Sequence, residues 1–231
     1  MRIEIWSDIV CPWCAIGKAR LDLALAQFEH ADDVDIRWRS FELDPGAPTV
    51  RDGDYATMLA RKYGTTVEGG HAMIRRMADE AAQSGLRLNL ERARPGNTFD
   101  GHRLLHLAAD RGVQNAVKDR LLRGYLAEGE AIGEHDTLLR LATEAGLDPD
   151  DARTVLDTSA YAYAVRTDER EAASHGISGV PYFLIDGWYP LPGAQTSDVM
   201  LDALRQAWRK SHPDTDTATS GTASALDGHH D

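Results

Sequence analysis

Hydrophobic and polar residues alternate along segment 2–7, and this period of two predicts a strand. From Pro12 onward the apolar residues recur at the three- and four-residue spacing of a helix, which we expect to span 12–29. A second alternating run, with one polar face, predicts a strand at 34–42. A strand, a helix and a strand in succession normally form a right-handed crossover. The two strands should therefore be parallel, with the second at an edge of the sheet.

The middle of the chain, from about 55 to 175, has helical apolar spacing throughout. The elements expected from there onward are helices at 55–63, 67–84, 98–111, 113–128, 136–145, 149–157 and 160–175, strands at 182–185 and about 188–191, and a last helix from Thr196. Asn97 and Asp136 resemble helix N-caps.

The composition fits a globular protein with an acidic surface. Hydrophobic residues make up 42% of the 231, and the formal net charge is −12. This charge argues against binding to nucleic acid, which requires a basic face. No apolar run approaches the roughly 18 residues of a membrane span, and Met1-Arg2 leads into the first strand without a signal peptide. We expect a cytoplasmic protein with a disordered tail over 211–231, where small and polar residues predominate.

The chain has two cysteines, Cys11 and Cys14, between the first strand and the first helix. Free N–H groups and the helix dipole favour a negative charge there, so the pKa of Cys11 should fall below about 8.5. Pro12 suits the first helical position because it lacks an N–H that would need a partner. Cys14 lies one turn deeper, where it could attack a mixed disulfide on Cys11, and Trp13 would tune the thiolate or contact substrate. This is the chemistry of a dithiol–disulfide exchanger.

Other interpretations of these residues remain open. A zinc site would need two more ligands, most obviously His102 and His106, which are about 90 residues away and outside the usual ligand spacing. A purely structural disulfide would close a very small loop and contribute ~2 kcal/mol on the chain-entropy model. His102 could instead approach Cys11 and assist proton transfer, although two partly exposed histidines on a capped helix are favoured.

Two pairs of arginines could attract an anionic ligand such as glutathione. They are Arg75-Arg76 in the second insertion helix and Arg37 with Arg39 in the second strand. Such charges more often lie on a solvated face, and we favour that interpretation.

A second segment supports redox chemistry. Residues 178–187 read as a turn, a proline, a short apolar strand and another turn, with Pro181 at the head of the strand, where a proline is permitted. Together with the strand, Cys-x-x-Cys and helix at the N-terminus, this segment resembles the thioredoxin superfamily. Within it, the chain is similar to the DsbA-like family, in particular the FrnE-type oxidoreductases. The matching stretches are 6–17, 97–104 and 176–183.

The resemblance implies an α/β, thioredoxin-like fold with a large all-helical insertion between the second and third core strands. Residues 1–210 would form this unit, with a core of 1–45 and 176–210 and an insertion of about 55–175. It also implies that a cis Pro181 faces the cysteines and keeps metal away, that the Val180 backbone binds an extended substrate, and that Asn97 lines the cleft.

The resemblance implies partners as well. These are thiols and disulfides, on proteins or small molecules, with glutathione as a candidate redox partner but no cofactor and no metal. A homodimer is compatible with the sequence.

The function expected from these observations is thiol–disulfide exchange through Cys11 and Cys14. One alternative is a glutathione-dependent enzyme of the kappa-class glutathione transferase or 2-hydroxychromene-2-carboxylate isomerase type. Those relatives carry a serine-type residue where this chain has Cys11. The other alternative is a non-catalytic, chaperone-like module that uses the insertion as a docking surface, and its function would survive Cys11→Ser.

Overall fold

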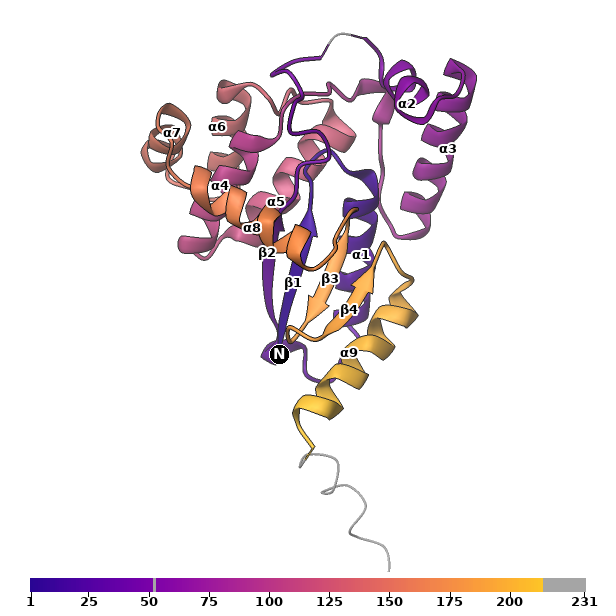
Figure 1. Cartoon of the computed structure of the whole chain (residues 1–231), viewed down its shortest axis with the longest axis vertical. Coiled ribbons are helices and arrows are strands. Elements are labelled where there is room, and N and C mark those ends of the chain that lie inside the picture. The colour runs from indigo at the N-terminus through magenta and orange to yellow at the C-terminus, as the bar shows by residue number, and fades with distance from the viewer. Residues whose placement is uncertain (52, 214–231) are drawn as a thin grey trace, which may run out of the picture.

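The computed structural model describes residues 1–51 and 53–213. In this part of the chain four strands form one sheet in the order β2-β1-β3-β4. The strands are β1 (Arg2–Ser7), β2 (Asp35–Ser40), β3 (Tyr182–Ile185) and β4 (Tyr189–Pro192). β1 is parallel to β2 and antiparallel to β3, which confirms the predicted crossover and the edge position of β2. Figure 1 shows β1 running from the N-terminus toward the end of the molecule where the central helices lie.

Both faces of the sheet are covered. Helices α1 (Pro12–Leu25) and α9 (Ser197–Ser211) cover one face, where Ile3 and Ile5 of β1 are fully buried. On the other face Trp6 packs beside α8 (Ala162–Ser174) and donates its indole N–H to the carbonyl of Asp168 at 3.0 Å. Burial on both sides fixes the strand register, because a slip of one residue would reverse every side chain.

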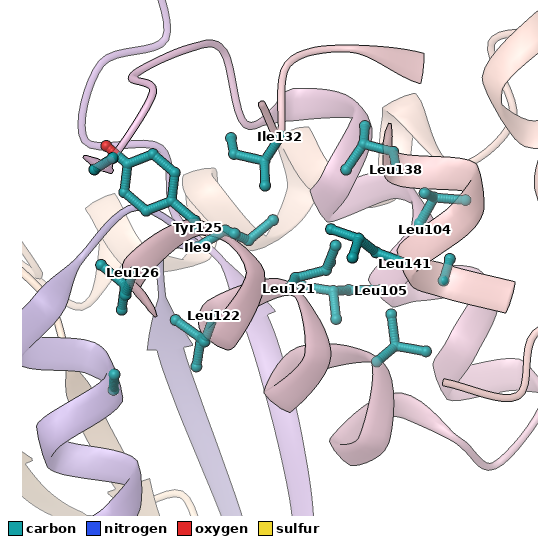
Figure 2. Packing of buried hydrophobic residues seen from close by; sticks show 14 of the residues in the cluster. Ile9, Leu104, Leu105, Leu121, Leu122, Tyr125, Leu126, Ile132, Leu138 and Leu141 are labelled. Atoms are coloured by element: carbon teal, nitrogen blue, oxygen red, sulfur yellow. The ribbon is translucent and has the colours of Figure 1, made fainter. Parts of the chain in front are cut away.

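Between β2 and β3 the described chain forms helices and loops. The helices are α2 (Tyr55–Tyr63), α3 (Val67–Gln83), α4 (Phe99–Asp110), α5 (Gln114–Arg123), α6 (His135–Glu144), α7 (Pro149–Asp157) and α8. The same segment has a 3-10 turn at Leu90–Arg92 and a π turn at Gly124–Glu128, and another 3-10 turn, Ala31–Asp33, precedes β2. They bury a second hydrophobic core, and Figure 2 shows Leu104, Leu121 and Leu141 pointing into the space between their helices. Ile9, in the loop after β1, belongs to this core and ties the insertion to the end of the strand.

The predicted thioredoxin-like sheet with a helical insertion is confirmed, and a few element bounds differ. Helix α1 ends at Leu25 instead of residue 29, because the N–H groups of Gln27 and Phe28 bond three residues back and tighten the chain into turns. Helix α6 begins at His135, so Asp136 lies inside its first turn and is not the cap. Most of the predicted tail, 214–231, lies outside the described residues, and α9 includes Ser211.

None of the described helices combines the length and the apolar composition that a transmembrane span requires.

A buried carboxyl ties the beginning of the insertion to α8. Glu42 follows β2, its side chain is fully buried, and it forms an ion pair with Arg166, which also pairs with Glu169 at 2.7 Å. Burial is the main cause that raises the pKa of Glu42 to about 7; the Glu169 carboxyl adds to the shift and Arg166 opposes it. The folded protein therefore holds a proton on Glu42 at pH values where the unfolded chain has released it.

We expect this carboxyl to make the free energy of unfolding fall as the pH rises from about 4.5 to about 7, since the folded state binds the extra proton in that range. The stabilisation is complete below the lower value and lost above the higher one. Glu42→Gln should remove this component, on the order of 1–3 kcal/mol. Urea unfolding of both proteins between about pH 5 and pH 8 measures it. Parallel pH curves for the two proteins would contradict the raised pKa.

Candidate active site

The loop after β1 places Cys11 at the N-cap of α1 and Pro12 at its first residue. The Cys14 N–H donates to Cys11 Sγ at 3.3 Å, so the first turn of the helix offers a free amide to this sulfur. Both cysteines are free thiols; 4% of Cys11 is exposed and none of Cys14. The predicted position of the pair at the start of the first helix is confirmed.

The loop that precedes β3 lies against Cys11. The Val180–Pro181 peptide is cis, and the Cys11 thiol lies 3.7 Å from the Val180 carbonyl oxygen, to which it can donate. Gly17 lets α1 approach this loop, because a Cβ at that position would lie 2.9 Å from Cγ of Pro181. Two segments far apart in the sequence therefore meet at one sulfur.

The two thiols are hydrogen-bonded and ionise as a pair. Burial opposes loss of a proton from Cys14, but the hydrogen bond from Cys11 and the charge of Lys118 outweigh it and lower the pKa of Cys14. The hydrogen bond with Cys14, burial and the charge on Cys14 then raise the pKa of Cys11 well above its ordinary value. The direction at Cys11 is opposite to the lowered pKa expected from its position at the helix start. The first negative charge of the pair is shared by two sulfurs that a hydrogen bond joins.

Lys118 of α5 is a buried cation that acts on this pair. Only 1% of its surface is exposed, and Nζ lies 5.3 Å from the centroid of the Trp38 ring. Burial lowers the pKa of Lys118, and the negative charges of Cys14 and Asp8 oppose that shift. Because a buried thiolate needs a compensating charge, Lys118 is suited to stabilise the ionised form of the pair.

Asp8 holds the cysteine loop in place. Its Oδ1 accepts the N–H of Ile9 at 2.7 Å and lies 3.3 Å from Nε2 of His102, while Oδ2 accepts the N–H of Leu43 at 2.8 Å. Burial would raise the pKa of Asp8, but the bonds from His102 and Leu43 keep it below its ordinary value. The ionised carboxylate thus joins the loop after β1 to α4 and to the loop after β2.

The two histidines of α4 lie against aspartates. His102 is fully buried on Asp8, whereas Nε2 of His106 lies 3.1 Å from Oδ2 of Asp168 and 3.2 Å from Oγ of Ser40. Both histidines are buried and not partly exposed, which differs from the expectation. The reason is that each one satisfies a buried carboxylate. Within the described residues no cluster of three His, Cys, Asp or Glu side chains is arranged to hold a metal ion.

Asn97 lies outside the cysteine cleft, contrary to expectation. Its Nδ2 donates to the carbonyl of Ala47 at 3.1 Å, and its Oδ1 accepts the N–H of Phe99 at 2.8 Å. The N-cap of α4 is Thr98, so Asn97 precedes the cap and does not form it. It lines a separate hollow of about 660 Å³ together with Asp100 and His135. The two hydrogen bonds fix the amide toward the 47–49 loop and away from Cys11.

Three of the arginines that could attract an anion lie in different environments. Arg39 is largely buried on the sheet, where Nη1 lies 2.8 Å from Asp168 and the same guanidinium pairs with Glu4, so it is not on a solvated face. Arg75 pairs with Glu68 in solvent. Arg76 lines the cavity at Cys11.

Cys11 opens onto this cavity, whose volume is about 770 Å³. Trp13 and Val180 line it beside the cysteine, and helices α2 and α3 contribute much of the remaining wall. The volume falls within the roughly 300–1,000 Å³ of small-molecule sites. The arrangement places a dithiol beside a space of the size that holds a small molecule.

A model of the DSBA-like thioredoxin domain matches residues 2–205 of the chain. The chain belongs to this DSBA-like family. It is 27% identical over 219 residues to the uncharacterised protein YwbO of Bacillus subtilis (strain 168), covering 91% of this chain and 98% of that protein. It is 43% identical to a probable DsbA oxidoreductase of Streptomyces coelicolor, with a TM-score of 0.86, covering 99% of this chain and 94% of that structure.

More distant structures share the DSBA-like fold. The cytosolic disulfide reductase DsbM of Pseudomonas aeruginosa is 20% identical, with a TM-score of 0.61, covering 91% of this chain and all of that one. A 2-hydroxychromene-2-carboxylate isomerase is 14% identical, with a TM-score of 0.63, covering 95% of this chain and all of that one. At these levels of identity the likeness shows a shared fold.

Sequence reasoning missed two residues of this DSBA-like site. Asp8 stands in the motif before Cys11, but an aspartate in a turn is ordinary and gave no signal of burial. Lys118 shares a helix face with Leu121 and Leu122, which are both buried, and a lysine on an apolar face was the available signal.

Proposed function

We propose that this protein is a thiol–disulfide oxidoreductase that exchanges a Cys11–Cys14 dithiol or disulfide with protein or small-molecule partners. The observation that carries the proposal is the position of Cys11 Sγ, which accepts a helix N–H, lies beside the Val180 carbonyl and borders a substrate-sized cavity. Membership of the DSBA-like family supports it.

The reaction transfers two electrons and can begin on the reduced pair. The Cys11 thiolate attacks one sulfur of the substrate disulfide, which forms a mixed disulfide and releases a first thiolate that takes up a proton. Cys14 then loses its proton, Lys118 stabilises the resulting thiolate, and this thiolate attacks the Cys11 sulfur. The second substrate thiolate departs and is protonated as Cys11 and Cys14 become a disulfide. Starting from that disulfide and a substrate thiol, the reverse sequence oxidises the substrate.

The cavity edge beside Cys11 would position the substrate. In this proposal the Val180 backbone bonds to an extended substrate, Pro181 shapes the edge and keeps metal from the thiols, and Trp13 contacts the substrate. Glutathione is the proposed small redox partner, supported by a DsbM structure described with GSH. A cytoplasmic location belongs to the same proposal, since DsbM is described as cytosolic.

A redox titration of the full chain tests the proposal. The fraction of Cys11–Cys14 disulfide is measured across glutathione buffers by thiol alkylation and mass spectrometry. We expect one reversible two-electron transition. Its midpoint, compared with a cytosolic poise of roughly −220 to −320 mV, assigns the direction of exchange. Failure to form the disulfide in any buffer would contradict the proposal.

A further inference from the structure

The wall of the cavity formed by α2 and α3 carries cations that lack a carboxylate partner. Arg61 of α2 and Arg76 of α3 both line the cavity, and neither forms an ion pair with a residue that the structure describes. Arginines elsewhere on this acidic chain are commonly paired, including Arg51 at the same cavity, which pairs with Asp44. Both arginines are exposed where they border the cavity, and a guanidinium group without a protein partner is suited to bind an anion.

The acidic residues of the cavity do not compensate these cations. Asp44 is held by Arg51, and Asp54 caps α2 by accepting from the N–H and the hydroxyl of Thr57 at 2.8 and 2.7 Å. Among the described residues that line the cavity, four side chains are cationic and two are carboxylates. The whole chain has a net charge of −12, yet the lining of the cavity that Cys11 borders carries an excess of positive charge. Such focusing favours an anionic ligand.

The rest of the lining is apolar and adaptable. It includes the methionines Met58, Met73 and Met77 and the tyrosines Tyr55 and Tyr125. Met77 and these two tyrosines are buried. Methionine side chains conform to ligands of different shape, and aromatic rings offer broad contact area. A ligand that fits this wall has an apolar body as well as an anionic group.

We propose that the substrate is a small disulfide or thiol that carries a carboxylate or similar anion beside an apolar portion. The anion contacts Arg61 and Arg76, the apolar portion packs on the methionines, and the sulfur meets Cys11. This inference rests on the proposed oxidoreductase function and adds its substrate class. Figure 1 shows α2 and α3 side by side at the edge of the molecule.

The test compares two aromatic disulfides of different charge. Reduced full-length protein reacts with dithiobis(nitrobenzoate), which carries carboxylates, or with dithiodipyridine, which is uncharged at neutral pH. In each reaction the dithiol is oxidised, the probe disulfide is reduced, and the two thiols released are followed by absorbance. We expect Arg76→Gln and Arg61→Gln each to lower the ratio of the anionic to the uncharged rate by about threefold to tenfold. Added salt should lower the same ratio.

Arg75→Gln is the matched control, because Arg75 is the neighbouring arginine but pairs with Glu68 and does not line the cavity. Its rate ratio should equal that of the wild type. Equal ratios in all variants, or equal losses with both probes, would overturn anion recognition while leaving the oxidoreductase function in place. If the wild type reacted with neither probe faster than Cys11→Ser, the oxidoreductase function itself would fail.

Discussion

Cys11→Ser is expected to abolish disulfide exchange, with a loss of roughly a thousandfold or more, because the hydroxyl does not ionise or attack sulfur under these conditions. Cys11 borders the cavity and receives the helix amide, whereas Cys14 is fully buried, so Cys14 cannot replace it. The measurement is the rate of reduction of a small disulfide by the reduced protein. The thermal midpoint, measured in parallel, should stay close to that of the wild type.

Cys14→Ser is the companion variant and should give a different result. Its Cys11 still attacks substrate, but the mixed disulfide has no resolving thiol and accumulates. Intact-mass analysis after mixing with a disulfide should show one adduct per chain. Full exchange activity in Cys11→Ser would contradict the role of Cys11 as the attacking thiol, and resolution of the adduct without Cys14 would show that the second step uses an external thiol.

Lys118→Met is expected to raise the pKa of the first thiol to ionise. The buried ammonium helps to hold the pKa of Cys14 down, and a neutral side chain of similar length removes that charge. Since the reduced form loses stabilisation, the disulfide becomes harder to reduce. The midpoint should move to more negative potential by ~30 mV for each tenfold loss. The pH dependence of thiolate absorbance and the glutathione titration measure the two effects.

Lys18→Met provides the control for this variant. Lys18 is also a buried lysine near the pair in sequence, but its charge is neutralised by Asp22 at 2.8 Å and Asp119 at 2.9 Å. We expect its thiol pKa and midpoint to stay at the wild-type values, at some cost in stability. If Lys118→Met left the thiol pKa unmoved, the buried ammonium would have no part in ionising the cysteines.

Much of the fold was predictable because it depends on local sequence. The alternation in β1 and β2, the apolar spacing of α2 and α7, and the hairpin around Asp186-Gly187 are properties of neighbouring residues. The cysteines at the start of α1 follow from Pro12 and the helix pattern after it. The resemblance to the DsbA-like family came from short motifs of the same kind, and the family model confirmed it.

The sequence by itself determined the elements, their order and the Cys-x-x-Cys chemistry. Only the tertiary structure decided what surrounds the sulfur atoms. It turned His102 toward Asp8, Asn97 toward the 47–49 loop and Lys118 into the interior. The reason is physical: a side chain's charge and exposure depend on which distant segments pack against it. Local propensity carries no information about which residues of α4 and α5 meet the loop that holds the cysteines. Lys118 of α5 is one such residue, and its charge helps to lower the pKa of Cys14.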